Sequence, residues 1–168
     1  MRMLKTVSLV LITLFSLQAV AFAGDKPIDA IKEKVKKMVE TRKKEAPSIS
    51  VQEFKNLMDK QESFFEILDI RTTEEFLAGH IAGAVNSDRN KLEWMTPNKI
   101  DDPAVPIYVY CKAGSRGALA TLRLIEMGYA NVTNVDGGLK AWANAGYPMY
   151  NDLGEFAFTE KGFGKKPE

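Results

Sequence analysis

Cysteine and histidine are almost absent from this sequence, and their scarcity narrows the chemistry it can perform. The 168 residues include one cysteine, Cys111, and one histidine, His80. A lone cysteine cannot form an internal disulfide, and a lone histidine excludes a metal site built from several histidines. Cys111 is therefore a buried apolar side chain, a link to another chain or a reactive thiol.

A long apolar run is also missing. Val7 to Val20 is apolar for about 14 residues, whereas a membrane-spanning helix needs ~20. Arg2 and Lys5 precede the run, and Ala21-Phe22-Ala23 follows it. This order is typical of a signal peptide, which we expect to occupy residues 1–23 with cleavage between Ala23 and Gly24. The mature protein is then predicted to be secreted or periplasmic, with no stable membrane insertion after cleavage.

Neither sign of charge is in excess. The full chain carries 23 Lys and Arg against 22 Asp and Glu, a formal net charge of +1. Loss of the signal peptide removes Arg2 and Lys5 and leaves 21 basic against 22 acidic side chains. This balance excludes a nucleic-acid-binding footprint and gives no support for an anionic membrane surface.

The remaining 145 or so residues suit a single domain with additions at both ends. Residues 24–47 are an expected N-terminal helical extension, with a helix over 27–46 that Pro47 ends. Four apolar residues recur on one face of this helix: Ile28, Ile31, Val35 and Met38. The helix either lies on its own domain or serves in self-association or binding of a protein partner. Residues 151–168 are expected to form a loosely docked or disordered C-terminal tail.

Segments with strand and helix character alternate through residues 48–150, the predicted main domain. The apolar runs at 64–70 and 107–110 are typical of strands buried on both faces. Shorter strands are predicted at 49–51, 84–86 and 131–135, and helices at 51–60, 72–78, 91–95, 115–127 and 139–144. This alternation predicts an α/β fold, a mostly parallel sheet covered by helices on both faces.

Cys111 stands at the carboxyl end of the strand at 107–110, where ligands bind in open α/β sheets. Because a helix begins at about Ser115, the connecting loop must curl tightly, and its backbone N–H groups can converge above the sulfur. This nest and the positive end of the helix both favour the thiolate, the nucleophilic form of cysteine. The surroundings of Cys111 thus favour a reactive thiol over a buried apolar side chain.

The other loop residues fit an anion-binding role. Gly114 allows close approach of the backbone, Lys112 adds a cation at the rim, and Ala113 adds no charge. Ser115 can hydrogen-bond a sulfur anion or cap the helix. Arg116 can contact an anionic substrate or brace the loop by pairing with a carboxylate, and the residues alone leave both roles open. The Cys-x4-Arg spacing is one residue shorter than the Cys-x5-Arg loop of cysteine-dependent phosphatases, which leaves a tighter cradle suited to one sulfur atom.

Three motifs in order resemble the rhodanese family over roughly residues 48–148. They are Leu68-Asp69-Ile70-Arg71 with its continuation to Asn86, Cys111-Lys-Ala-Gly-Ser-Arg116, and Gly128-Tyr129 with Asn134 to Trp142. The resemblance implies a rhodanese-like fold, a five-stranded mainly parallel sheet flanked by helices, here with an extra N-terminal helix.

The resemblance also implies a thiosulfate sulfurtransferase activity. Sulfane sulfur would pass from a donor such as thiosulfate to a thiophilic acceptor, a thiol or cyanide, through a persulfide on Cys111, without a metal or organic cofactor. Residues 112–116 would surround the substrate, with Lys112 the best candidate for recognising thiosulfate. Two alternatives are a persulfide carrier and a non-catalytic interaction module, and the intact Cys111, Gly114 and Arg116 argue against the second.

Asp69, Arg71 and Glu75 are expected to support this loop. The first two lie at the end of the neighbouring strand and are predicted to be structural rather than to contact substrate. Glu75 is predicted to pair with Arg71 at about one helical turn's distance. His80 is expected to be architectural, as its motif is in the family, and Trp142 to lie in the core.

Overall fold

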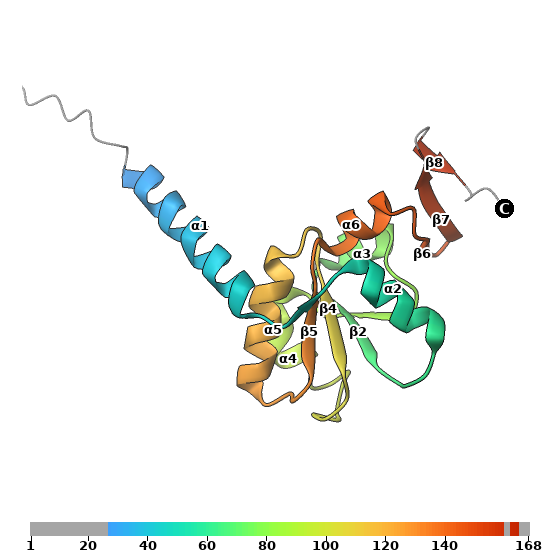
Figure 1. Ribbon diagram of the computed structural model, residues 1–168, viewed down its shortest axis with the longest axis horizontal. Coiled ribbons are helices and arrows are strands. Elements are labelled where there is room, and N and C mark those ends of the chain that lie inside the picture. Colours follow the sequence, from blue (N-terminus) through green and yellow to red (C-terminus); the bar gives the residue numbers. More distant parts are fainter. Residues whose placement is uncertain (1–26, 160–161, 165–168) are drawn as a thin grey trace, which may run out of the picture.

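A five-stranded parallel sheet forms the centre of the computed structural model, which describes residues 27–159 and 162–164 (Figure 1). Its strands are β1 (Ser48–Ile49), β2 (Glu66–Asp69), β3 (Ala84–Asn86), β4 (Ile107–Tyr110) and β5 (Val132–Val135), arranged in the order β1-β5-β4-β2-β3. Every neighbouring pair is parallel. The predicted α/β architecture is confirmed. The expected signal peptide at 1–23 lies outside the described residues.

Helices cover both faces of this sheet. The helices of the described residues are α1 (Pro27–Glu45), α2 (Val51–Lys60), α3 (Thr73–Ala78), the 3-10 helix η1 (Arg89–Lys91), α4 (Leu92–Met95), α5 (Ser115–Met127) and α6 (Gly138–Asn144). Figure 1 shows α4 and α5 on one face and α2 and α6 on the other. The sheet is therefore buried on both faces, as its apolar strands require.

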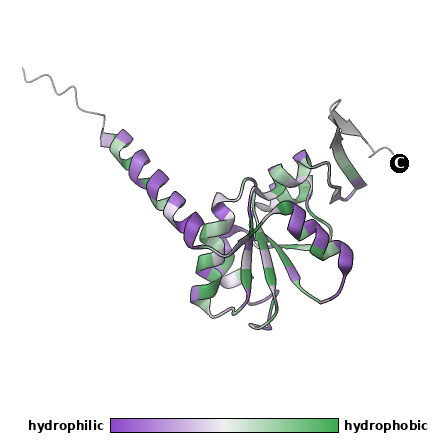
Figure 2. Ribbon diagram, in the orientation of Figure 1, coloured by the Kyte–Doolittle hydropathy of each residue, from purple (hydrophilic) through white to green (hydrophobic). Residues whose placement is uncertain are grey.

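The alternation of side chains along β4 divides the core into two parts. Ile107 and Val109 pack with Leu124 of α5 on one face. Tyr110 packs with Trp142 of α6 on the other. Figure 2 shows the apolar residues gathered along the strands between these helices. One strand thus fixes the position of both helical layers.

Strand register brings the ends of β2, β4 and β5 to one edge of the sheet. Asp69 lies opposite Tyr110 in the β2–β4 pair, and Val109 lies opposite Asn134 in the β4–β5 pair. The loops that follow these three strands therefore meet at the same edge. This is the edge at which Cys111 follows β4.

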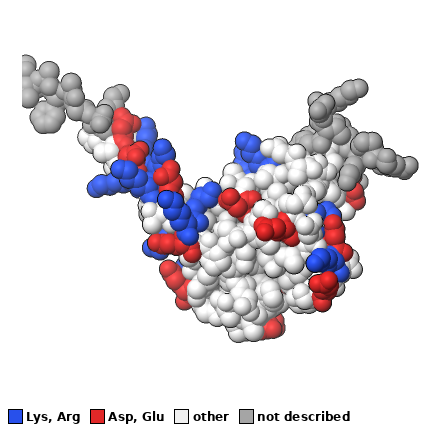
Figure 3. All heavy atoms as spheres, viewed as in Figure 1, with Lys and Arg blue, Asp and Glu red and all other residues white. Residues whose placement is uncertain are grey.

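The helix α1 meets its own domain only near its C-terminal end (Figure 1). There Val39 and Lys43 are half-buried next to α5, and Lys43 Nζ lies 3.2 Å from Asp136 Oδ1 in the β5–α6 loop. The apolar stripe of Ile28, Ile31, Val35 and Met38 remains about half exposed. Figure 3 shows Lys and Arg gathered along the same helix. Across the part of the chain that the structure describes, no helix is both long and apolar enough to cross a membrane.

The C-terminal segment differs from the expectation of a loose tail. Strands β6 (Met149–Asn151) and β7 (Gly154–Thr159) form an antiparallel hairpin, and β8 (Gly162–Gly164) pairs with β7. Met149 and Ala157 are buried, and Phe156 packs against the core around Trp142. The Asn151 side chain accepts a hydrogen bond from the Leu153 N–H, which turns the chain between the strands. Apolar burial explains why this part of the segment is ordered.

Candidate active site

The loop after β4 curls around the sulfur of Cys111. Cys111 is 1% exposed, and α5 begins at Ser115. The Gly114 backbone N–H donates a hydrogen bond to Cys111 Sγ at 3.2 Å. One loop amide of the described residues is thus directed at the sulfur, whereas the short loop led us to expect several to converge there.

The other side of this loop is held by the first turn of α6. The Leu139 N–H donates to the carbonyl of Cys111 at 2.8 Å, and the Lys140 N–H donates to the carbonyl of Lys112 at 2.9 Å. Because α6 donates to these carbonyls, the backbone acceptors on that side of the loop have hydrogen-bond partners. The loop can then direct the Gly114 N–H to the sulfur.

Glycine is required where the loop meets the β5–α6 connection. Gly114 has φ +89°, and a Cβ there would lie 2.8 Å from Asp136 Oδ1 and 2.9 Å from the Gly137 nitrogen. A Cβ on Gly138 would lie 2.3 Å from the carbonyl oxygen of Cys111. The two connections approach each other more closely than side chains would allow.

Gly114 also occupies the N-cap of α5, and no side chain caps this helix. The suggested capping role of Ser115 is therefore wrong, because Ser115 is the first residue of the helix. The left-handed backbone of Gly114 turns the chain directly from the loop into α5.

Arg116 forms a two-point ion pair with Glu75 of α3. Arg116 Nη1 lies 3.0 Å from Glu75 Oε2, and Nη2 lies 3.1 Å from Oε1. The expected pairing of Glu75 with Arg71 is wrong, because Arg71 is bound to Asp69. Glu75 also closes the N-terminus of α3 by accepting from the Thr72 N–H at 3.2 Å. One carboxylate thus ties the start of α3 to the active loop.

Arg116 also interacts with the sulfur of Cys111. The hydrogen bond to Glu75 is the main reason that the pKa of Arg116 is raised, and a charge interaction and hydrogen bond with Cys111 add to it. The hydrogen bond to Arg116 likewise lowers the pKa of Glu75. Arg116 therefore braces the loop and keeps a positive charge beside Cys111.

Arg71 and Asp69 form a buried ion pair at the end of β2. Arg71 Nη2 lies 2.6 Å from Asp69 Oδ2 and also donates to the Gly79 carbonyl at 2.7 Å. Burial opposes the positive charge of Arg71, but the hydrogen bond and charge of Asp69 outweigh it and raise the pKa of Arg71. Arg71, held by Asp69, thus binds the α3–β3 connection at Gly79.

The remaining sequence candidates occupy different places. Lys112 and Ala113 are exposed at the tip of the loop. His80 stacks on Phe76 at 3.9 Å between ring centroids, which is an architectural contact. Trp142 is buried in the core. Among the described residues, no group of three His, Cys, Asp or Glu side chains could hold a metal ion.

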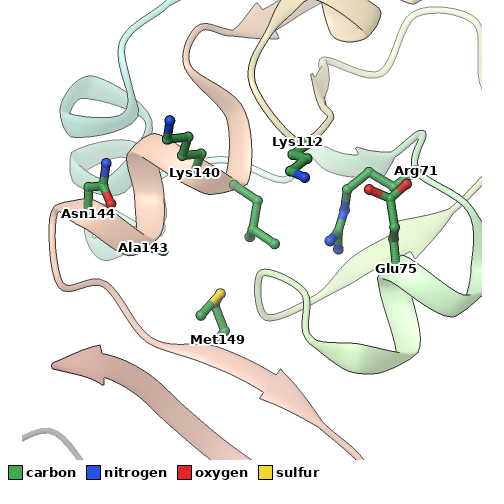
Figure 4. A pocket seen from close by; sticks show the side chains of 8 residues that line it. Arg71, Glu75, Lys112, Lys140, Ala143, Asn144 and Met149 are labelled. Atoms are coloured by element: carbon green, nitrogen blue, oxygen red, sulfur yellow. The ribbon is translucent and has the colours of Figure 1, made fainter. Parts of the chain in front are cut away.

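A pocket of about 410 Å³ opens beside the loop. It is lined by Arg71, Glu75, Lys112, Leu139, Lys140, Ala143, Asn144 and Met149. Figure 4 shows Lys112 between Arg71 on one side and Lys140 on the other. The residues from α6 and β6 were missed as site residues because they belong to no loop motif. The Gly137-Gly138 pair was the available signal, since it marks a close approach of backbones.

A model of the rhodanese-like domain family matches residues 50–145, which is more than half of the chain. The chain belongs to the rhodanese-like domain family. Thiosulfate sulfurtransferase 18 of Arabidopsis thaliana is 31% identical over 121 residues, covering 65% of this chain and 87% of the plant protein.

Two further comparisons define how far this likeness extends. The adenylyltransferase and sulfurtransferase UBA4 of Lodderomyces elongisporus is 32% identical over 114 residues, and this rhodanese spans 25% of its length. The solution structure of the rhodanese-like domain of the Anabaena Alr3790 protein superposes with a TM-score of 0.60 at 27% identity, covering 64% of this chain and 80% of that one. The likeness confirms the predicted rhodanese fold.

Substitution of Gly114 by alanine tests the close approach in the loop. We expect Gly114→Ala to lower the free energy of unfolding by about 1–3 kcal/mol more than Gly146→Ala does. Both glycines have positive φ, but no atom lies within 4 Å of a Cβ at Gly146. Urea unfolding of the two variants isolates the steric cost, and equal losses would contradict the predicted clash.

The Glu75–Arg116 pair predicts a pH dependence of stability. Because the pKa of Glu75 lies below its ordinary value of 4.5, its ionised form stabilises the fold above that pH, and this contribution is lost as the pH falls through the lowered value. Glu75→Gln should cost about 1 kcal/mol at pH 7, since both partners are partly exposed, and little at a pH below the lowered pKa of Glu75. Urea unfolding at several pH values checks this. Glu62→Gln, an exposed carboxylate in no ion pair among the described residues, is the control, and an equal profile for both variants would refute the pair's role.

Proposed function

We propose that this rhodanese is a sulfurtransferase that carries sulfane sulfur as a persulfide on Cys111. The observation that carries the proposal is the loop amide directed at Cys111 Sγ, in a loop whose carbonyls are bound by α6. A persulfide terminates in an anionic sulfur, and fixed N–H donors stabilise such a charge without reorganisation. The names of both sulfurtransferase relatives agree with this assignment.

The first half-reaction loads the cysteine. The Cys111 thiolate attacks the outer sulfur of a donor such as thiosulfate, forming a new S–S bond. The S–S bond of thiosulfate breaks, and sulfite leaves with the bonding electron pair. Lys112 supplies positive charge near the site of attack, which favours approach of an anionic donor.

The second half-reaction removes the sulfane sulfur from Cys111. An acceptor nucleophile, a thiolate or cyanide, attacks the sulfane sulfur, and the bond between that sulfur and Cys111 Sγ breaks. Its electron pair returns to Sγ as the thiolate, so no redox partner, metal or organic cofactor enters the balance. A slow first half-reaction with thiosulfate would instead make the protein a persulfide carrier loaded by another donor.

We also propose export of this protein through its N-terminal segment. The basic start, the apolar run and the Ala21-Phe22-Ala23 sequence support removal of residues 1–23. Expression of the full chain in a bacterium with a periplasm, followed by intact mass measurement of the periplasmic protein, should give a chain that begins at Gly24. A full-length chain confined to the cytoplasm would refute export.

Replacement of Cys111 by serine separates the chemistry from the fold. Serine is close to cysteine in size and can accept from the Gly114 N–H, so we expect a stability change within about 1 kcal/mol. Sulfur transfer should vanish, because a serine hydroxyl stays protonated and cannot hold a persulfide. Intact mass after thiosulfate treatment should show the gain of one sulfur atom in the wild type and none in the variant. Thiocyanate release from thiosulfate and cyanide should follow the same pattern.

Two results would contradict this assignment. Residual transfer by Cys111→Ser would show that Cys111 is not the carrier. Marked destabilisation of the variant, with activity in proportion to the folded fraction, would favour a structural cysteine. Slow loading of Cys111 by thiosulfate, with little thiocyanate release, would favour the carrier over the enzyme.

A further inference from the structure

The apolar stripe of α1 is not covered by any part of the chain that the structure describes. Its four residues, Ile28, Ile31, Val35 and Met38, are between 49% and 55% exposed. They recur at spacings of three and four residues, so they share one face of the helix. No residue of α1 is buried, and the helix projects from the domain (Figure 1). A contiguous apolar face of this kind marks an interaction surface.

Lysines border the stripe on both sides. Lys32 follows Ile28 by four residues, and Lys34 precedes Met38 by four. Because residues three and four apart are neighbours on a helix, the two lysines lie along opposite edges of the stripe. Lys34 is exposed and forms no ion pair among the described residues. The ammonium group of Lys32 lies 3.0 Å from Asp29 Oδ1, but both side chains are exposed, so this pair is weak.

The acidic residues of α1 lie mainly on the other face. Asp29, Glu33 and Glu40 follow one another at spacings of four and seven residues, which places them opposite the stripe. The helix carries seven basic against four acidic side chains, a net charge of +3. The nearly balanced charge of the whole chain conceals this local excess, which Figure 3 shows along the helix. The helix therefore has an apolar face, lysine borders and an acidic back.

This arrangement favours an anionic phospholipid surface over a second copy of the chain. An amphipathic helix on a bilayer lies in the plane of the interface, with its apolar side chains at the acyl boundary. Lysines at the border of the apolar face can extend their stems along it and place their ammonium groups among the phosphates. Two copies of α1 would each bring a net charge of +3 to their contact, and like charges repel.

The base of α1 is joined to the edge of the sheet at which Cys111 lies. Lys43 Nζ lies 3.2 Å from Asp136 Oδ1, and the same oxygen would lie 2.8 Å from a Cβ on Gly114. Val39 is half-buried next to α5. A surface bound by the free part of α1 would therefore hold the domain by a packed helix end rather than by a loose linker.

We propose that α1 binds this protein to the surface of an anionic phospholipid bilayer. The four residues of the stripe enter the interface, and Lys32 and Lys34 lie at the level of the phosphates. The helix lies on the bilayer without crossing it, in agreement with the lack of a helix long and apolar enough to cross within the described chain. The proposal does not depend on the chemistry at Cys111.

The test uses the chain from Gly24, which contains every described residue. This chain lacks the apolar run at 7–20, which could bind lipid by itself. Binding to vesicles is measured by co-sedimentation over a range of lipid concentrations. One set of vesicles is phosphatidylcholine alone, and the other contains about one-third phosphatidylglycerol, an anionic lipid.

We expect about tenfold stronger binding to the anionic vesicles, with a difference that shrinks in high salt. Lys34→Glu should weaken this binding by about tenfold. Lys36→Glu is the matched control, because Lys36 is exposed, forms no ion pair in the described part of the chain and lies on the acidic face. A helix is about 10 Å across, which is close to one Debye length, so the control should lose much less.

The apolar stripe is tested by Ile31→Ser. This variant should bind both kinds of vesicle about fivefold more weakly, because less apolar surface enters the interface. Isoleucine and serine have similar helix propensities, so α1 should persist, and far-ultraviolet circular dichroism checks this. Leu153→Ser is the control, because Leu153 is a 96% exposed apolar residue of the β6–β7 turn. It should bind as the wild type does.

Four results would each overturn the proposal. They are no binding to vesicles, equal binding to neutral and anionic vesicles, equal losses with Lys34→Glu and Lys36→Glu, and equal losses with Ile31→Ser and Leu153→Ser. Sedimentation equilibrium without lipid tests the second copy as the occupant. A dimer that Ile31→Ser dissociates would assign the stripe to self-association instead. Sulfur loading of Cys111 is measured separately, and its failure would leave the lipid proposal standing.

Discussion

The hydrogen bonds between the first turn of α6 and the carbonyls of Cys111 and Lys112 are the constraint on which the active loop depends. A loop buried at the end of a strand must satisfy its backbone groups, and α6 satisfies the carbonyls. The chain can then turn an N–H toward the sulfur, as Gly114 does. The close approach that this requires leaves no room for a Cβ on Gly114 or Gly138. The chemistry proposed for Cys111 is thus linked to the packing of two backbone connections.

Ion pairs around this loop separate structural charges from available ones. Arg71 and Arg116 are both engaged by carboxylates, one buried and one partly exposed. Each arginine would otherwise compete for an anionic substrate, and each carboxylate would repel it. Because the charges within each pair cancel, the net positive charge at the pocket comes from Lys112 and Lys140 at its rim. These lysines are exposed to solvent, so salt screens their charge. Recognition of an anion at this rim is therefore expected to be weak and adjustable.

The C-terminal hairpin and the N-terminal helix α1 contact the domain in different ways. The C-terminal hairpin packs Met149 and Phe156 against the domain and so extends the wall of the pocket beside the active loop. The helix α1 contacts α5 at one end and leaves its apolar stripe exposed, while Lys43 reaches Asp136 next to the active loop. The family model matches residues 50–145, so both additions lie largely outside the matched segment.

Local patterns in the sequence determined the sheet, its helices and the candidate nucleophile. Buried parallel strands are continuous apolar runs, and a loop of four residues between a strand and a helix has few ways to turn, so β4, α5 and the nest at Cys111 followed from 107–116. Other features depended on contacts between distant segments. The i, i+4 rule predicted an ion pair between Glu75 and Arg71. In the structure Arg71 pairs with Asp69 at the end of β2, and Glu75 pairs with Arg116, which lies 41 residues away in the sequence. The pocket likewise combines a loop, a helix and a hairpin. Only the folded chain could decide these pairings, because their energies depend on three-dimensional proximity that spacing along the sequence does not encode.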